Sequence, residues 1–214
     1  MTNADEWMNL TAGEATGLLY VPEPAPGGAV RLVVLFHGAG QAPRSVANIL
    51  GRQAREQGFA LLLPKSTGPT WDAIRGQPGP DLHALDELLA ASTSRAAIDL
   101  DPISLAGFSD GASYALGVGT SFGDRFRKVI AFSPGFVAKL GDPAGTPRIF
   151  VSHGRNDTVL PIASTSRRLV PALRLAGYQV RYEEFTGGHA VPGSIADAAV
   201  GWLLPEPPAA PVTS

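Results

Sequence analysis

The chain has 214 residues, of which 44% are hydrophobic and 17% charged, with a formal net charge of −2. A near-neutral balance gives no electrostatic attraction to nucleic acid or to an acidic membrane surface. The absence of cysteine excludes disulfides, thiolate metal sites and a thiol nucleophile.

The length favours a single domain over residues 1–214, with a core at about 15–204. Residues 1–7 (Met-Thr-Asn-Ala-Asp-Glu-Trp) are polar and acidic, unlike a secretory signal. The longest apolar stretches, 32–36 and 59–63, have five residues each and are too short to cross a bilayer. We therefore expect a cytoplasmic protein without integral membrane association.

Short apolar runs alternate along the chain with longer segments of helical periodicity. The apolar runs predict strands at 30–36, 59–63, 103–106, 129–132, 149–151 and 179–182. The periodic segments predict helices at 42–57, 81–97, 162–175 and about 194–203, and a further helix that begins at Asp110. This alternation is typical of βαβ units and predicts an α/β fold, with a mostly parallel central sheet and helices on both faces.

Four other segments complete this arrangement. Residues 18–21 (Leu-Leu-Tyr-Val) predict an antiparallel edge strand. Residues 1–14 and the proline-rich tail at 205–214 are expected to be weakly packed. The stretch 65–80, rich in glycine and proline, predicts a long connection of the kind that is often functional.

A G-x-S-x-G pattern lies between a predicted strand and a predicted helix. It consists of Gly107-Phe-Ser109-Asp-Gly111 and follows directly on strand 103–106. Small residues on both sides of the serine permit a sharp strand-to-helix turn, which exposes the hydroxyl at a helix N-terminus that favours developing negative charge. The pattern indicates Ser109 as a nucleophile.

A second glycine-rich turn, 36–40 (Phe-His-Gly-Ala-Gly), follows strand 30–36. In α/β folds that carry a serine nucleophile on such a strand-to-helix turn, the loop after an earlier strand supplies one backbone donor of the oxyanion hole. The residue after the nucleophile supplies the other donor. The expected donors are the N–H groups of Ala39 and Asp110. Because a carboxylate that faced the oxyanion would oppose catalysis, we expect the Asp110 side chain to point away.

An acid and a base are then expected downstream of the serine, in that order. Asp157 follows strand 149–151, and His189 follows strand 179–182 after two glycines. His189 would take the proton of Ser109, and Asp157 would hold the imidazole tautomer. Asp142, in an earlier loop, is the rival acid, but its loop does not lead directly from a predicted sheet strand.

The remaining histidines have structural interpretations. His83 lies in the predicted helix 81–97, which favours a surface or packing position. His153 ends a strand near Asp157 and is expected to be structural. His37 precedes the nucleophile in the chain, so it is expected to orient or pack its loop rather than act as the base.

Taken together, four segments resemble small α/β-hydrolases of the phospholipase/carboxylesterase family, which includes bacterial serine esterases and acyl-protein thioesterases. The segments are 35–40 (Leu-Phe-His-Gly-Ala-Gly), 107–111 (Gly-Phe-Ser-Asp-Gly), 153–157 (His-Gly-Arg-Asn-Asp) and 187–189 (Gly-Gly-His). They occur in the order of the family and extend the resemblance over about residues 15–204.

The resemblance implies an α/β-hydrolase fold and a carboxylic-ester hydrolase that works through an acyl-enzyme, without metal or cofactor. It implies that Ser109 is the nucleophile, His189 the base and Asp157 the orienting acid, with Ala39 and Asp110 as oxyanion donors. A chain of this length leaves little room for a large lid domain, which favours soluble esters of short to medium acyl chain over lipase substrates.

Departures from the family pattern concern the acyl pocket. Family members often have a bulkier apolar residue in place of Ala39, Gly-Asp in place of Gly40-Gln41, and Gln in place of Asp110. Donation from the backbone N–H survives these changes. Acyl-group preference is therefore affected more than catalysis.

Three apolar residues are candidates for the wall that contacts the acyl group. Trp71 and Phe136 lie in predicted loops, and Leu160 follows shortly after Asp157. Aromatic residues in such loops also pack the core, and for Trp71 and Phe136 the two interpretations are equally supported.

The expected partner is a small-molecule ester, and the sequence is compatible with a homo-oligomer. Alternative functions are a lysophospholipase or acyl thioesterase acting on longer chains, and a polyester depolymerase. A non-catalytic ligand-binding protein on the same fold is a further alternative, because a fold does not determine a function.

Overall fold

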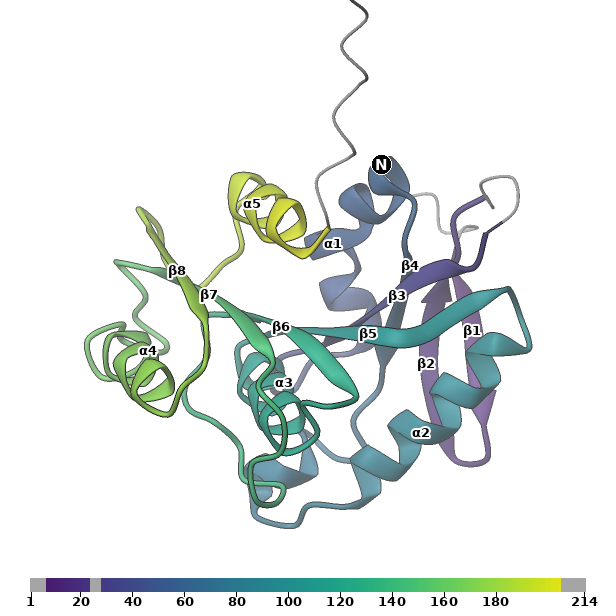
Figure 1. The fold of residues 1–214 in the computed structure, drawn as a ribbon, viewed down its shortest axis with the longest axis horizontal. Helices are drawn as coiled ribbons and strands as arrows, with labels where there is room; N and C mark the ends of the chain where they lie inside the picture. The colour runs from purple at the N-terminus through teal and green to yellow at the C-terminus, as the bar shows by residue number, and fades with distance from the viewer. Residues whose placement is uncertain (1–6, 24–27, 205–214) are drawn as a thin grey trace, which may run out of the picture.

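The computed structural model describes residues 7–23 and 28–204, which form an eight-stranded sheet with helices on both faces (Figure 1). The strands are β1 (Met8–Ala12), β2 (Ala15–Tyr20), β3 (Val30–Phe36), β4 (Ala60–Pro64), β5 (Ile98–Phe108), β6 (Phe126–Phe132), β7 (Arg148–Gly154) and β8 (Val180–Phe185). The helices are α1 (Pro43–Gln57), the short 3-10 helix η2 (Asp72–Arg75), α2 (Pro80–Thr93), α3 (Asp110–Ser121), α4 (Ser166–Leu175) and α5 (Gly193–Leu203). The strand order is β1-β2-β4-β3-β5-β6-β7-β8.

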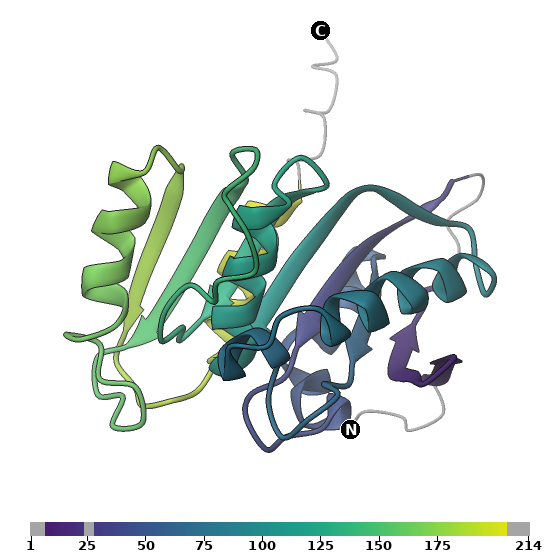
Figure 2. The same cartoon turned by 90° about the horizontal axis from the view of Figure 1, so that it is seen from below.

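The sheet is parallel from β4 to β8 and antiparallel only where β2 joins β1 and β4. Helices α1 and α5 cover one face, and α2, α3 and α4 cover the other (Figures 1 and 2). This arrangement confirms the predicted α/β architecture. Among the described residues, no helix combines the length and the apolar character needed to cross a membrane.

The central strands are apolar on both faces because each face is buried under helices. Along β3, Leu32, Val34 and Phe36 belong to the core beneath α2 and α3, whereas Val33 and Leu35 belong to the core beneath α1 and α5. The alternation follows from the two-residue period of a strand. Each fully buried side chain of this size contributes about 1.5–3 kcal/mol relative to an exposed one.

The largest difference from the sequence-based expectation lies at the N-terminus. Residues 7–14 were expected to be weakly packed, but β1 pairs with β2 and buries Trp7 and Leu10 to 6% and 1% exposure. The expectation was wrong there because a five-residue strand with one deeply buried residue carries little periodic signal. The antiparallel orientation of β2 was predicted correctly, but β1 takes the edge position. Residues 1–6 and the tail 205–214 lie outside the described part.

Several element boundaries also differ. Strand β5 begins at Ile98 rather than at residue 103, because the polar pair Asp99 and Asp101 interrupts its apolar pattern. Helix α2 ends at Thr93, four residues before the predicted end, and α4 begins at Ser166, four residues after the predicted start.

The turn between β5 and α3 requires glycine at two positions. A Cβ on Gly107 would lie 2.1 Å from the carbonyl oxygen of Gly111, and a Cβ on Gly111 would lie 2.2 Å from that of Phe36. Both contacts are with backbone, which cannot rotate away. The serine between them is thereby held close to the end of β3.

We expect Gly107→Ala and Gly111→Ala each to lower the free energy of unfolding by about 3 kcal/mol or more, because the added methyl group overlaps backbone. The measurement is urea-induced unfolding. Gly201→Ala in α5 is the matched control, because a Cβ there meets nothing within 4 Å. It should be neutral or stabilising by about 0.5–1 kcal/mol. Equal effects of the core and control substitutions would contradict the assigned clash.

Candidate active site

Ser109 occupies a strained turn between β5 and α3. Its φ and ψ are 57° and −121°, in a region that residues other than glycine seldom adopt. Its N–H donates to the carbonyl of Phe132 at 3.0 Å, and its own carbonyl accepts from the N–H groups of Ala112 and Ser113 at 3.0 and 3.1 Å. These bonds hold the serine in place at the N-terminus of α3.

Asp157 and His189 come from the loops after β7 and β8 and form a short hydrogen bond. His189 Nδ1 lies 2.6 Å from Asp157 Oδ2. The other carboxylate oxygen, Oδ1, accepts from the N–H groups of Val159 and Leu160 at 2.9 and 2.8 Å. Burial alone would raise the pKa of Asp157, but the hydrogen bonds from Leu160, His189 and Val159 bring it below its ordinary value. The carboxyl is therefore ionised at neutral pH.

His189 lies beside the turn that carries Ser109. Its ring packs against that of Phe108, the residue before Ser109, with ring centres 4.7 Å apart. Within residues 7–23 and 28–204, no hydrogen bond joins the Ser109 hydroxyl to His189. Such bonds are often long in a free enzyme and shorten when substrate binds.

The glycine-rich turn after β3 lies against the serine. A Cβ on Gly38 would be 3.4 Å from the Ser109 Cβ. The N–H of Gly38 donates to the Gln41 side chain, and that of Gly40 donates to the carbonyl of Pro69. Between them, the N–H of Ala39 donates no hydrogen bond to any described residue.

The N–H of Asp110, in the first turn of α3, is likewise without an acceptor in the described part of the chain. The Asp110 carboxylate accepts a hydrogen bond from the Thr70 hydroxyl at 2.8 Å. Thr70 thus fixes the direction of this acidic side chain, a function that was not foreseen from the sequence.

His37 is fully buried and orients the turn after β3. Its Nδ1 donates to the carbonyl of Gly38 at 2.8 Å, and its Nε2 accepts from the N–H of Ser66 at 3.2 Å. Burial lowers the pKa of His37, which keeps the ring neutral as this hydrogen-bond pattern requires. The orienting role predicted from its place in the chain fits these contacts.

Trp71 packs the core and presents no surface to a substrate. It is 1% exposed, stacks on Tyr114 with ring centres 4.9 Å apart, and donates its indole N–H to the carbonyl of His37 at 2.8 Å. Its prediction as a substrate-binding residue is therefore wrong. The sequence does not distinguish a loop aromatic that faces a cleft from one that faces inward.

The connection that carries Trp71 is closed by two buried carboxylates. Asp72 and Asp81 accept each other's backbone N–H, at 2.7 and 2.6 Å, and Asp81 also accepts from the N–H of Thr67. Burial raises the pKa of Asp72. This closed loop supports the contacts of Ser66 and Trp71 with His37.

The other two apolar candidates remain accessible. Phe136 is 46% exposed, and Leu160 is half-buried. The loop of Phe136 is tied to helix α3, because the N–H of Gly135 donates to the Ser113 hydroxyl at 3.0 Å. A Cβ on Gly135 would lie 3.7 Å from the Leu160 side chain, so the two loops are in contact. The bridging function of Ser113 has no signature in the sequence.

The rival acid Asp142 and the helix residue His83 lie elsewhere. Asp142 is in an exposed loop, and no hydrogen bond among the described residues involves its side chain. His83 lies on α2 with its side chain 78% exposed, 3.6 Å from Glu87.

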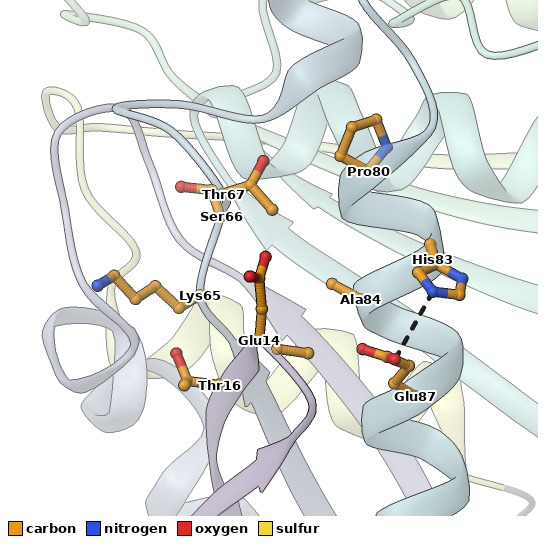
Figure 3. A pocket seen from close by; sticks show the side chains of 10 residues that line it. Glu14, Thr16, Lys65, Ser66, Thr67, Pro80, His83, Ala84 and Glu87 are labelled. Atoms are coloured by element: carbon orange, nitrogen blue, oxygen red, sulfur yellow. Dashed lines mark ion pairs between the residues drawn. The ribbon is translucent and has the colours of Figure 1, made fainter.

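A separate cavity of about 360 Å³ lies between the β1–β2 turn, the loop after β4 and α2 (Figure 3). Its lining mixes Glu14 and Glu87 with Lys65 and His83. None of the residues predicted to be catalytic lines it.

No family model matches the sequence, and no curated protein matches it significantly. Among solved structures, the esterase PE8 is 26% identical and has a TM-score of 0.71, with 87% of this chain and 96% of that chain covered. The fluorophosphonate-binding serine hydrolase FphF of Staphylococcus aureus is 14% identical, with a TM-score of 0.72 and coverage of 93% and 98%. The Bacillus cereus carboxylesterase is 16% identical, with a TM-score of 0.70 and coverage of 89% and 93%.

These neighbours share the sheet and its helices over most of their length. The chain has the α/β-hydrolase fold. In an α/β-hydrolase the nucleophile lies on a sharp turn from strand to helix, with the acid and base in later loops. Ser109, Asp157 and His189 occupy positions of this kind.

We expect Trp71→Phe to destabilise the protein, because it leaves the buried carbonyl of His37 without its indole donor. Trp7→Phe is the matched control, since the Trp7 indole N–H is buried and has no partner among the described residues. Both variants lose the same volume, so the difference between them should be about 1–3 kcal/mol in the free energy of unfolding. Equal losses in chemical denaturation would contradict a role for this hydrogen bond.

Proposed function

We propose that this α/β-hydrolase is a serine carboxylesterase that hydrolyses small carboxylic esters of short to medium acyl chain. The observation that carries the proposal is the short Asp157–His189 hydrogen bond, formed beside a serine that is held in a strained strand-to-helix turn. The esterases and serine hydrolases among its structural neighbours support the same class of reaction.

In the proposed mechanism, His189 Nε2 takes the proton of Ser109 Oγ as the serine oxygen attacks the ester carbonyl carbon. Asp157 holds the proton on Nδ1 and stabilises the imidazolium. The tetrahedral intermediate collapses to an acyl-enzyme, and the alcohol leaves with the proton from His189. Water then attacks the acyl-enzyme by the same route, which releases the acid and restores the serine.

The negative charge of the tetrahedral intermediate would be bound by the backbone N–H groups of Ala39 and Asp110. Both are without acceptors in the described part of the chain. Asp110 directly follows Ser109, and Ala39 directly follows Gly38, which lies against the serine. Because the Thr70 hydroxyl holds the Asp110 carboxylate, the orientation of this acidic group is constrained. Donors fixed in advance stabilise an oxyanion without reorganising at the moment of reaction.

The acyl group would lie against Phe136 and Leu160. Their loops lie close together, and both are anchored near the site, Phe136 through Ser113 and Leu160 through Asp157. Accessible apolar side chains at this place suit contact with the acyl chain of a soluble ester.

We expect wild-type protein to hydrolyse p-nitrophenyl esters with an optimum between acetate and octanoate, and Ser109→Ala to lower kcat by about 10⁴-fold or more. Asp157→Asn should lower kcat by about 10³- to 10⁴-fold, because the imidazole loses its correct tautomer. Asp142→Asn is the matched control and should retain activity.

Activity that survives Ser109→Ala would exclude Ser109 as the nucleophile. An optimum at palmitate would instead favour the lysophospholipase or thioesterase alternative. No activity on any ester, together with no labelling by a fluorophosphonate probe, would favour a ligand-binding protein.

We expect Phe136→Ala to raise KM for hexanoyl and octanoyl esters by about 3- to 10-fold, because an apolar contact with the acyl chain is lost. The KM for the acetyl ester should change little, since its methyl group is too short to reach this side chain. Phe122→Ala provides the control, because Phe122 is 37% exposed but lies at the opposite end of α3 from Ser109. An equal change in KM for all esters would rule out Phe136 as a wall of the acyl site.

A further inference from the structure

A second histidine, His153, contacts the same carboxylate oxygen as His189. His153 is the penultimate residue of β7 and is fully buried. Its Nε2 lies 3.2 Å from Asp157 Oδ2 and 2.8 Å from the carbonyl oxygen of Leu160. Its Nδ1 lies 2.6 Å from the hydroxyl oxygen of Ser166, at the start of α4.

The partners of His153 determine where its proton lies. The Leu160 carbonyl and the ionised Asp157 carboxylate can only accept hydrogen bonds, so Nε2 must carry the proton. Burial lowers the pKa of His153, which leaves the ring neutral and Nδ1 free to accept. The Ser166 hydroxyl is therefore the donor to Nδ1, and it selects the tautomer that points a proton at Asp157.

Asp157 is consequently surrounded by donors. The N–H groups of Val159 and Leu160 bind Oδ1, and His189 binds Oδ2. The Nε2–H of His153, which donates to the Leu160 carbonyl, lies 3.2 Å from the same Oδ2. The backbone of Leu160 is held on both sides, because its N–H donates to Asp157 and its carbonyl accepts from His153. The acid loop is thus closed around the carboxylate.

We propose that His153 is a positioning residue of the proposed esterase, which aims Asp157 Oδ2 at His189 and weakens the hold of Asp157 on the His189 imidazolium. The inference rests on the proposed function. The positive end of the His153 Nε2–H dipole, 3.2 Å from Oδ2, offsets part of the carboxylate charge. The protonated form of His189 is therefore stabilised less than it would be by a carboxylate without this neighbour. A base that releases its proton more readily protonates the leaving alcohol more easily.

Other charged groups near His153 are already paired. Its partner on β8 is Glu184, whose carboxylate binds Arg155 and Arg167. The Arg167 guanidinium on α4, together with these other hydrogen bonds, lowers the pKa of Glu184 to about 2. The ionisable groups that act on His153 itself are Asp157 and His189.

Three substitutions separate positioning from simple packing. His153→Phe retains the ring volume but donates nothing. His153→Gln places an amide N–H near the former Nε2, whereas His153→Asn places one near the former Nδ1, because the shorter side chain ends there. His83→Phe, on an exposed histidine of α2, is the matched control.

The first readout is kcat/KM for a p-nitrophenyl ester against pH, corrected for the active fraction titrated with a fluorophosphonate. We expect His153→Phe and His153→Asn to lower kcat/KM by about 10- to 100-fold and to move the acidic limb of the profile upward by about one pH unit. His153→Gln should recover most of the activity and of the profile. His83→Phe should match wild type.

The second readout is the titration midpoint of the His189 imidazole, followed by NMR, which requires no turnover. An upward shift of this midpoint in His153→Asn but not in His153→Gln supports the proposal. The comparison of these two variants is sufficient even if His153→Phe does not fold. The proposal would be overturned if the acidic limb of the pH profile and the titration midpoint of His189 were both unchanged in His153→Asn and in His153→Gln. Wild-type protein without esterase activity would refute the proposed function, while the midpoint would still test the His153 contact.

Discussion

The close approach of the β5–α3 turn to the end of β3 is the constraint on which the candidate site depends. Gly111 lies so near the Phe36 carbonyl that no side chain fits, and the strained Ser109 is held between the two glycines of the turn. The same approach brings the Gly38–Gly40 turn against the serine. The proposed nucleophile and the proposed oxyanion donors are therefore brought together by one packing contact between the ends of adjacent parallel strands.

Around this contact, hydrogen bonds from segments distant in the sequence hold the neighbouring loops. The connection after β4 holds His37 from two sides, through the backbone of Ser66 and the indole of Trp71. On the other side, Ser166 and His153 hold the loop of Asp157. His37 and His153 are thus both buried and neutral, and each is hydrogen-bonded through both ring nitrogens. Both support turns.

The sequence was most informative where the chemistry needs particular residue types in a particular order. The serine between glycines, the later acid and the last histidine are recognisable because each follows an apolar run that reads as a strand. All three fall at strand ends in the structure, and Asp157 and His189 are joined. The alternation of strands and helices was sufficient to predict the fold.

The sequence did not show which way a side chain faces. Trp71 was placed at the substrate but faces the core, and β1 was missed because its one deeply buried residue gives no period.

Asp72 and Asp81 make the connection after β4 a closed loop whose two ends are fastened by reciprocal hydrogen bonds. Residues 75–80 lie between these two aspartates and are exposed, and the N–H groups of Gln77 and Gly79 also donate to Asp72. The entropy of closing a loop grows only slowly with its length, so extra residues in this exposed stretch would leave the reciprocal bonds of Asp72 and Asp81, and with them the support of His37, in place. The chain can therefore lengthen here without disturbing the strand ends that carry the candidate site.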